Sequence, residues 1–331
     1  MHNPLVTLLV LNWNGQSIIE ECIHSLKKTE YNNIEILVVD NASTDNSLTL
    51  LNKIDGIRIV SNQTNLGYAA GNNVGFKHAC GKYIATLNND IVVEPTWLNE
   101  AITFLEENNS IGIISCRQMD YYKRDKIDSL YSVPTPFLLL QRGCRGETYL
   151  QKDNHSKPGY VIGANGASAI YRKEMLDTIG GFEESFFAYQ EENDLQMRCF
   201  INGWKCVYVP TALVYHMGSA TFNKVKDILY YYHERNRIWY IYRYFPASII
   251  IQNIFTILLR EIRTMANIVF LRKRPGIYLK ARRDGFSGLF KFTAVRKINI
   301  QNFRKRYKEY RLLEKNKIIL IENKSTNQIS T

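Results

Sequence analysis

The chain has 331 residues, of which 45% are hydrophobic and 22% are charged. This length and hydrophobic content allow one large α/β domain with an appendage and exclude an intrinsically disordered chain. The six cysteines include no Cys-x-x-Cys pair and no signal-like apolar stretch follows Met1, so we expect free thiols in a reducing cytoplasm.

The net charge of +11 is unevenly distributed along the chain. Residues 221–331 contain 24 of the 42 Lys and Arg residues but only 7 of the 31 Asp and Glu residues, so residues 1–220 are acidic overall. The two segments are therefore expected to have different electrostatic partners.

The first half of the chain predicts an alternation of strands and helices. Short apolar runs predict strands at 6–11, 34–39, 57–60, 83–87 and 111–115. Amphipathic stretches between them predict helices at 17–27, 45–51, 68–79 and 96–106, the last with Pro95 near its first turn. This alternation is typical of an α/β fold with a doubly wound, mostly parallel sheet.

Polar residues follow four of these strands at the point where each strand ends. They are Asn12 to Gly15, Asp40 to Asp45, Asn62 to Asn65, and Asn88 to Asp90. Ligands of such sheets bind beyond the carboxyl ends of the strands, so we expect all four segments to line one crevice.

The periodicity is lost over residues 117–159, which contain Arg142 and Arg145. We expect a long loop there, acting as a lid or an interaction segment. Further strands are predicted at 163–171 and 204–209. An acidic cluster, Glu191 to Asp194, lies between them, and His216 follows the second.

These motifs, in this order, resemble those of family 2 glycosyltransferases of the GT-A fold, and within that family the rhamnosyltransferase-like branch. The resemblance covers about residues 5–245. Its carriers are Leu11 to Gly15, Val38 to Asp45, Asn65 to Gly75, Leu87 to Asp90, Gly180 to Phe182, Glu191 to Leu195, and Tyr215-His216. It implies a catalytic domain over 1–220, with a donor half at about 1–116 and an acceptor half at about 160–220, followed by a basic, aromatic helical tail over 221–331.

The resemblance also implies an activity. We expect inverting transfer of a hexose, or of a deoxyhexose such as rhamnose, from a nucleoside-diphosphate sugar to a hydroxyl of a cell-surface, lipid-linked glycan. A divalent metal, Mg²⁺ or Mn²⁺, would be held by Asp90 and His216. The family's Asp-x-Asp motif reads Asn88-Asn89-Asp90 here, so only one carboxylate remains and we expect modest metal affinity. The alternatives are a helix cap for Asp90 and a structural hydrogen bond for His216.

Contacts to the donor are expected from the segments that follow the strands. Asp40 could accept a hydrogen bond from a pyrimidine imide, or could instead form an Asx turn that caps the next helix. Gly67 permits close backbone approach and Asn72 could reach a ribose or diphosphate, although a glycine-bearing loop is also ordinary turn chemistry. The expected nucleotide-sugar ligands are Asn12, Asn14, Gly15, Asp40, Asn41, Ser43, Asn65, Gly67, Asn72 and Asn88.

The expected catalytic carboxylates are Glu192, Glu191 and Asp194. Mutual repulsion in a crevice would raise the pKa of one of them and create a general base, whereas the alternative role is to complement the dipole of a helix. The order of the motifs places this cluster opposite the donor, so we assign the base to Glu192. Asp194 is the better candidate for a structural or acceptor-positioning role.

The tail predicts a membrane-surface segment. Its basic clusters, at 272–274, 282–283 and 304–306, alternate with aromatic and aliphatic residues, as in interfacial segments that bind anionic lipid. The apolar stretch 248–259 is too short to span a bilayer. Residues 230–237 could touch the diphosphate or the lipid carrier, or could pack on the catalytic domain. We therefore expect a cytoplasmic protein, peripheral at the inner face of the cell membrane, with no nucleic-acid partner.

Two other functions remain open. A sugar-phosphate nucleotidyltransferase also uses a doubly wound sheet and metal-binding aspartates, but Asn12 to Gly15 lacks the Gly-rich phosphate loop and basic residues expected there. The reduced metal motif also allows a non-catalytic scaffold that binds a glycan or a membrane.

Overall fold

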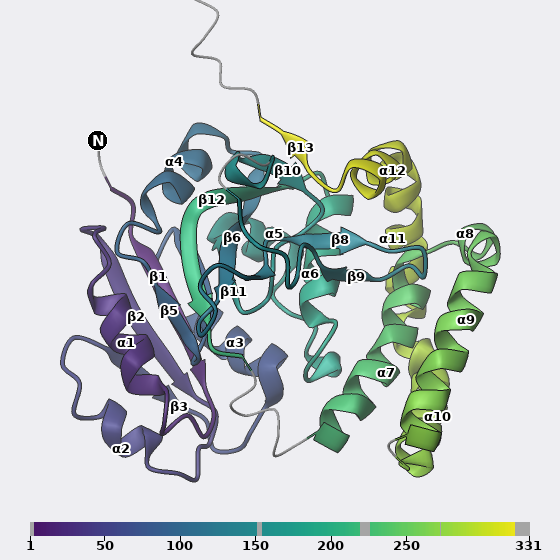
Figure 1. Cartoon of the computed structure of the whole chain (residues 1–331), viewed down its shortest axis with the longest axis horizontal. Coiled ribbons are helices and arrows are strands. Elements are labelled where there is room, and N and C mark those ends of the chain that lie inside the picture. Colours follow the sequence, from purple (N-terminus) through teal and green to yellow (C-terminus); the bar gives the residue numbers. More distant parts are fainter. Residues whose placement is uncertain (1–2, 151–153, 219–225, 272, 322–331) are drawn as a thin grey trace, which may run out of the picture.

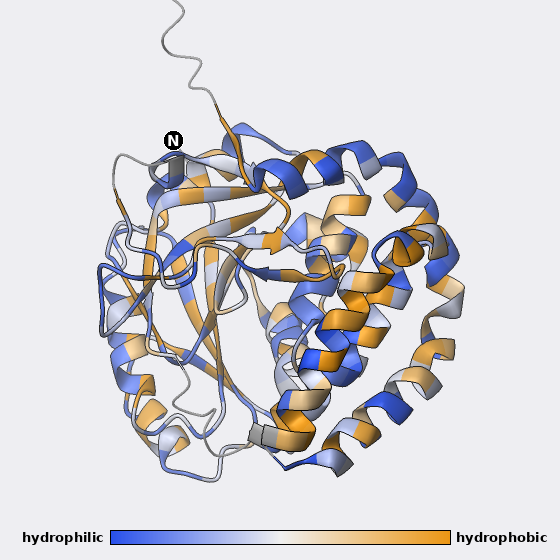
Figure 2. Ribbon diagram, turned by 45° about the vertical axis from the view of Figure 1, so that its right-hand side comes forward, coloured by the Kyte–Doolittle hydropathy of each residue, from blue (hydrophilic) through white to orange (hydrophobic). Residues whose placement is uncertain are grey.

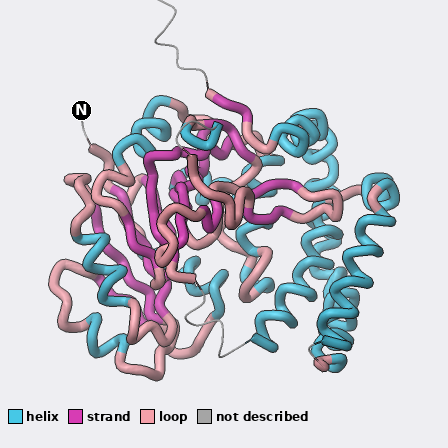
Figure 3. The backbone as a smooth tube through the Cα atoms, in the orientation of Figure 1, coloured by secondary structure: helices cyan, strands magenta, loops and turns pink. Residues whose placement is uncertain are grey.

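The computed structural model describes residues 3–150, 154–218, 226–271 and 273–321. A twisted central sheet is flanked by helices, and the C-terminal helices gather along one side of it (Figures 1 and 3). The basic cluster predicted at 272–274 lies partly outside the described residues, at position 272.

The first part of the chain, expected to be the donor half, forms a parallel sheet with crossover helices, as predicted. Its strands are β1 (Val6–Asn12), β2 (Ile34–Asp40), β3 (Arg58–Ser61) and β4 (Tyr83–Asn88), and their spatial order is β4-β1-β2-β3. The connecting helices are α1 (Ile19–Lys27), α2 (Ser47–Leu51) and α3 (Gly67–His78). Because β1 is central and covered on both faces, Val6 and Leu8 to Val10 are fully buried.

The second half adds both parallel and antiparallel strands. Strand β11 (Ser168–Arg172) lies antiparallel between β4 and β6 (Ile111–Asp120), and β12 (Lys205–His216) runs parallel to β6. Strands β5 (Ile91–Val93) and β10 (Gly159–Val161) pair with β12. The helices are α4 (Asn99–Glu107), α5 (Lys173–Ile179) and α6 (Glu191–Ile201), with short 3₁₀ turns at Asn154–Ser156 and Glu184–Phe186. The predicted α/β fold is confirmed.

The expectation of a long irregular loop over 117–159 is wrong. Strand β6 continues to Asp120, and three short strands follow: β7 (Ile127–Ser129), β8 (Ser132–Pro134) and β9 (Leu140–Arg142). Each is only three residues long, so none leaves a readable alternation in the sequence. Burial of Leu130, Tyr131 and Leu138 to Leu140 holds this segment against the domain.

The C-terminal part is helical, as predicted. It consists of α7 (Lys226–Tyr244), α8 (Ala247–Gln252), α9 (Ile254–Met265), a π-helical turn (Ala266–Leu271), α10 (Pro275–Ser287), a 3₁₀ turn (Gly288–Phe292), α11 (Thr293–Lys305) and α12 (Tyr307–Asn316). The chain then returns to the sheet, where β13 (Ile319–Leu320) pairs with β10. None of the helices within the described ranges is both long and apolar enough to cross a bilayer.

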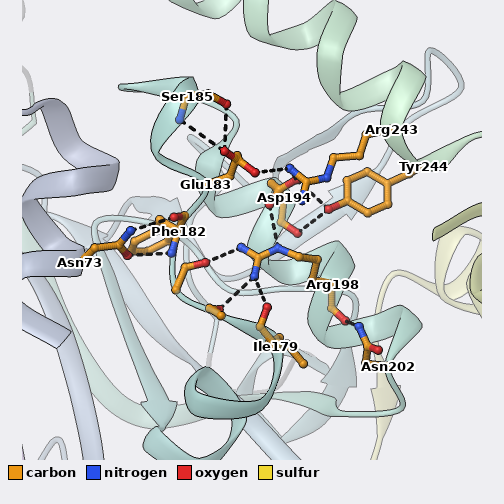
Figure 4. A network of polar contacts seen from close by, with 12 residues as sticks. Asn73, Ile179, Phe182, Glu183, Ser185, Asp194, Arg198, Asn202, Arg243 and Tyr244 are labelled. Atoms are coloured by element: carbon orange, nitrogen blue, oxygen red, sulfur yellow. Dashed lines mark hydrogen bonds and ion pairs between the residues drawn. The ribbon is translucent and has the colours of Figure 1, made fainter. Parts of the chain in front are cut away.

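A buried ion-pair network joins α6 to α7 (Figure 4). The fully buried carboxylate of Asp194 accepts a hydrogen bond from Arg198 Nε at 2.9 Å and one from Tyr244 Oη at 2.7 Å. Arg243 Nη1 lies 3.1 Å from the same carboxylate. Arg198 also donates to the carbonyls of Ile179 and Gly180, so one acid organises the end of α5, helix α6 and helix α7.

We expect the substitution Asp194→Asn to lower the free energy of unfolding by about 3 kcal/mol, because it leaves the buried Arg198 and Arg243 without their shared counter-charge. Urea denaturation measures this change. Asp177→Asn is the control, since the exposed Asp177–Lys173 pair should contribute less than about 0.5 kcal/mol. A loss of equal size in the two variants would contradict this account of the network.

Candidate active site

The carboxyl ends of β1 and β2 are joined by a hydrogen-bond network between side chains. Asn12 lies opposite Asp40 in the sheet and donates to its Oδ1 at 2.9 Å, and also to Ser43 and Ser47. Asp40 Oδ2 accepts from the Ser43 amide at 3.0 Å, and Oδ1 accepts from the Ser43 hydroxyl at 2.6 Å. Asp40 is 1% exposed; the amide that it accepts from is three residues on, not the two of an Asx turn, and α2 begins at Ser47 with no side-chain cap. A contact between Asp40 and a pyrimidine remains a prediction.

Asn41 ties the loop after β3 to the end of β2. Its Nδ2 donates to Asn65 Oδ1 at 2.9 Å and to the Gly67 carbonyl at 3.1 Å, and its Oδ1 accepts from Asn62 and from the Leu66 amide. Because both ends of this buried amide are used, Asn41 and Asn65 shape the loop.

Two glycines in the expected donor set stand where a side chain would not fit. At Gly15, a Cβ atom would overlap Asn12 Oδ1 and lie 2.5 Å from Asn89 Nδ2. At Gly67, φ is +79° and a Cβ would lie 2.6 Å from Phe187 Cδ2. Gly67 thus brings α3 against the loop that leads to the acidic cluster.

The remaining donor candidates differ in how accessible they are. Asn14 adopts a left-handed conformation and accepts a hydrogen bond from the Thr44 amide at 2.8 Å. Asn88 is half-buried at the end of β4. Asn72 is 1% exposed and its Nδ2 donates to the Tyr68 carbonyl of the same helix at 2.9 Å. The geometry of Asn72 argues against the expected contact with a ribose or diphosphate, because its side chain turns into the helix.

The two expected metal ligands meet although 126 positions separate them in the sequence. Strand β12 pairs with β5 and so places His216 beside the residue that follows Asp90. The His216 Nε2 atom lies 3.3 Å from Asp90 Oδ1, a buried oxygen with no hydrogen bond of good geometry. On its other side, His216 Nδ1 lies 2.9 Å from Asp128 Oδ2. His216 is thus held between two carboxylates.

Asp128 was not among the expected site residues. It lies on β7, a three-residue strand that leaves no alternation in the sequence, so its place in the sheet could not be predicted from local pattern. Arg142 Nη1 lies 3.2 Å from its carboxylate and Arg145 Nε lies 3.7 Å away. Burial alone would raise the pKa of Asp128, but the hydrogen bond to His216 and the charge of Arg142 lower it below its usual value. Asp128 therefore orients His216 as an ionised partner.

The acidic cluster begins α6, as the sequence indicates, but its carboxylates have different surroundings. Glu191 is buried, and burial together with the charge of Glu192 raises its pKa well above the usual range. The Asp194 carboxylate is already paired with Arg198 and Arg243, which argues against the catalytic role expected for it.

Glu192 is half-buried. Its carboxylate packs on Gly166, where any Cβ would overlap it. Burial raises the pKa of Glu192, and the nearby Arg142 and His216 act in the opposite direction. The influence of these two groups indicates that Glu192 shares one electrostatic environment with the Asp90–His216 pair.

The Asp90–His216 pair fits a hard divalent cation. It offers a carboxylate oxygen and an imidazole nitrogen aimed at each other, and the outer nitrogen of the ring is fixed by Asp128, as is usual for histidines that bind metals. A second group of potential ligands, Cys144, Glu147 and His155, also lies close together. Its thiol and imidazole suit Zn²⁺ better than Mg²⁺, so it does not match the expected site.

The family model described as glycosyl transferase family 2 matches residues 7–180, more than half of the chain. The chain belongs to this family. An uncharacterized glycosyltransferase of Haemophilus influenzae is 37% identical over 112 residues, which are 33% of this chain and 35% of that protein. The chain spans between a quarter and a half of the length of the first three such relatives, 35%, 25% and 46%.

Solved structures with a similar fold cover nearly the whole chain. The mannosyltransferase PcManGT of Pyrobaculum calidifontis, in complex with GDP-Man and Mn²⁺, has a TM-score of 0.54 at 17% identity and covers 95% of this chain and 84% of its own. Residues 1–349 of S. aureus TarS, in complex with UDP-GlcNAc, have a TM-score of 0.57 at 19% identity, with 97% of both chains covered. These likenesses support the GT-A fold.

We expect the affinity for Mn²⁺ to rise about tenfold per pH unit between about pH 6.5 and about pH 8.5. Burial alone would lower the pKa of His216, but hydrogen bonds to Asp128 and Asp90 raise it to about 9. Below that pH the ring carries a proton that must leave before a metal can bind, so raising the pH favours binding. Isothermal titration with Mn²⁺ at several pH values measures the effect.

Two variants control this measurement. Asp90→Ala should lower the affinity for Mn²⁺ at least tenfold, whereas Asn88→Ala, which keeps the carboxylate and His216, should change it little. An affinity that does not depend on pH, or that survives Asp90→Ala, would rule out a metal held by Asp90 and His216.

Proposed function

We propose that this chain is an inverting, metal-assisted glycosyltransferase. It would transfer a hexose, or a deoxyhexose such as rhamnose, from a nucleoside-diphosphate sugar to a hydroxyl of a lipid-linked cell-surface glycan. The observation that carries the proposal is the buried Asp90 Oδ1, which lies 3.3 Å from His216 Nε2 and has no hydrogen-bond partner within the described part of the chain. Membership of family 2 supports it. GDP-Man with Mn²⁺ in PcManGT and UDP-GlcNAc in TarS support a nucleotide-sugar donor and a divalent metal.

The proposed reaction is a single in-line displacement. Glu192 accepts the proton of the acceptor hydroxyl while the acceptor oxygen forms a bond to the anomeric carbon, and the bond from that carbon to the diphosphate breaks. Because the raised pKa of Glu192 lies closer to neutral pH than that of an ordinary glutamate, it can accept a proton more effectively. A bound Mg²⁺ or Mn²⁺ would neutralise charge on the departing diphosphate.

A panel of nucleotide sugars tests the proposal directly. Thermal unfolding with Mn²⁺ and each candidate donor identifies those that bind, because a ligand of the folded state raises the melting temperature. Metal-dependent hydrolysis or transfer with a binding donor would then separate an enzyme from a non-catalytic scaffold. If no donor is bound or turned over, the proposal fails.

We expect Glu192→Gln to lower kcat by a factor on the order of 10² to 10⁴ with little change in donor affinity, because glutamine keeps the size of the side chain but cannot accept the proton. In the unmodified enzyme, kcat should fall as the pH drops through the raised pKa of Glu192, since the protonated acid is no longer a base. Steady-state kinetics with a binding donor measures both effects.

Glu191→Gln is the matched control. The raised pKa of Glu191 favours its neutral form, which an amide resembles, so this change should cost little activity. If Glu191→Gln or Asp194→Asn abolished turnover while Glu192→Gln kept it, the base would be assigned to the wrong member of the cluster.

We further propose a cytoplasmic position, peripheral at the inner face of the membrane. Helix α9 leaves a row of apolar side chains exposed, including Phe255 at 83% and Ile262 at 58%. Basic residues of the tail lie close by in sequence, and this combination suits an anionic lipid surface.

The double substitution Phe255→Ser with Ile262→Ser should therefore weaken binding to vesicles that contain phosphatidylglycerol, and salt should weaken binding of the unmodified protein. Vesicle sedimentation measures both. Tyr122→Ser, which removes an apolar side chain that is 75% exposed on another surface, is the control. Equal binding by all three proteins would exclude α9 as the contact surface.

A further inference from the structure

A cavity of about 340 Å³ lies between α7, α9 and the π-helical turn. Its wall includes Tyr230 and His233 from α7, Arg260 and Arg263 from α9, and Tyr189 from the loop that enters α6. Tyr189 is two residues before Glu191, and its pKa is raised by burial and by the charge of Glu191. The cavity thus adjoins the loop that carries the proposed base.

Positive charge exceeds negative charge in and behind this cavity. Glu234 and Glu261 are the acids present, and both are already paired with Arg237 and Arg282. Glu234 lies 2.9 Å from Arg237 and 2.8 Å from Arg282, and it also contacts His233 at 3.1 Å. Glu234 and Glu261 therefore each have close cationic partners other than the two arginines of α9.

Arg260 has only one long ion pair and Arg263 has none in the described residues. The nearest carboxylate oxygen to Arg260 is that of Glu234 at 3.8 Å, and Arg260 Nη1 is buried with no hydrogen-bond partner. No ion pair is formed by Arg263 within the parts of the chain that the structure describes. Burial and the charge of Arg237 lower the pKa of Arg260 to about 10, and Glu234 and Glu261 offset this only in part.

The helix that supplies these arginines also carries the exposed apolar row. Its members, at helical spacing, are Phe255, Leu258, Leu259, Ile262 and Met265. Figure 2 shows hydrophobic residues interspersed with hydrophilic ones on the C-terminal helices, which come forward in that view. One helix therefore presents cations to a cavity and hydrocarbon to the surface.

We propose that this cavity binds the phosphate group of a lipid phosphate between Arg260 and Arg263, with the hydrocarbon chain of the lipid along the apolar row of α9. The inference rests on the proposed transfer to a lipid-linked glycan, and it assigns the binding site for the lipid end of that acceptor. A lipid phosphate suits the site because guanidinium groups hold phosphate oxygens and α9 offers apolar surface beside them. Tyr189 then connects this site to the loop of Glu191 and Glu192.

Binding of farnesyl phosphate to the full chain tests the proposal without any sugar transfer. We expect farnesyl phosphate to bind at least tenfold more tightly than farnesol, which lacks the anion, and than inorganic phosphate, which lacks the chain. If farnesol bound as tightly as farnesyl phosphate, the proposed phosphate site would be wrong. If inorganic phosphate bound as tightly as farnesyl phosphate, the proposed site for the hydrocarbon chain would be wrong.

The double variant Arg260→Gln with Arg263→Gln should lose about tenfold or more of the affinity for farnesyl phosphate. The single variant Arg263→Gln changes an exposed side chain and should lose several-fold, which keeps the test valid if the double variant does not fold. Lys27→Gln with Lys28→Gln removes two exposed charges at the C-terminal end of α1, a helix on the opposite side of the molecule (Figure 1), and this variant should bind normally. Unchanged binding in Arg263→Gln and in a folded double variant would overturn the proposal.

Failure of this inference and failure of the proposed function can be distinguished. Donor binding should be the same in Arg263→Gln and in the unmodified protein. Tight, Arg263-dependent binding of farnesyl phosphate without any sugar transfer would support the cavity and contradict only the proposed activity. Sugar transfer with no binding of farnesyl phosphate would contradict only the cavity.

Discussion

A buried carboxylate must be balanced by nearby positive charge, and Asp194 meets this requirement with Arg198 of its own helix and Arg243 of α7. The first partner fixes the turn between α5 and α6 through backbone carbonyls, and the second fixes α7 against α6. The position of Glu192 at the start of α6 follows from these contacts. The C-terminal helices are therefore part of the framework that holds the proposed base, and β13 completes the join by pairing with β10.

The donor side depends on a different kind of constraint. Parallel strands end at one edge of the sheet and leave backbone groups that the loops must satisfy. Short amide and carboxylate side chains can satisfy these groups because they are small. Asn12 donates to Asp40, Asn41 donates to Asn65, and Asp40 accepts from the Ser43 amide. We infer that their main contribution is to fix the positions of these loops relative to one another. In the proposed donor site, half-buried side chains such as Asn88 are more accessible than Asn12, Asp40 and Asn41.

The sequence predicted the strands and helices of the donor half within a few residues, because each apolar run is long enough to show its period. It also predicted which motifs would meet at one edge of the sheet, including Asp90 and His216. It could not predict Asp128 or the strands of 117–159, since three-residue strands leave no pattern and their partners are distant. It separated Glu192 from Asp194 by role, but it could not predict the partners of Asp194, because Arg243 and Tyr244 lie about fifty positions away on α7.

The loop before α6 contacts both α3 and the C-terminal helix α7. Phe187, Tyr189 and Gln190 all have positive φ, and none is glycine, so the loop stores strain that its surroundings must balance. Asn236 of α7 donates to the carbonyls of Phe186, Ala188 and Tyr189 at 2.7 to 2.8 Å, while the Phe187 carbonyl accepts from the Ala69 amide of α3. The loop is thus held by α3 on one side and by α7 on the other, and these hydrogen bonds offset its strain. Because this loop leads directly to Glu191 and Glu192, the geometry of the proposed base depends on both the donor half and the C-terminal helices.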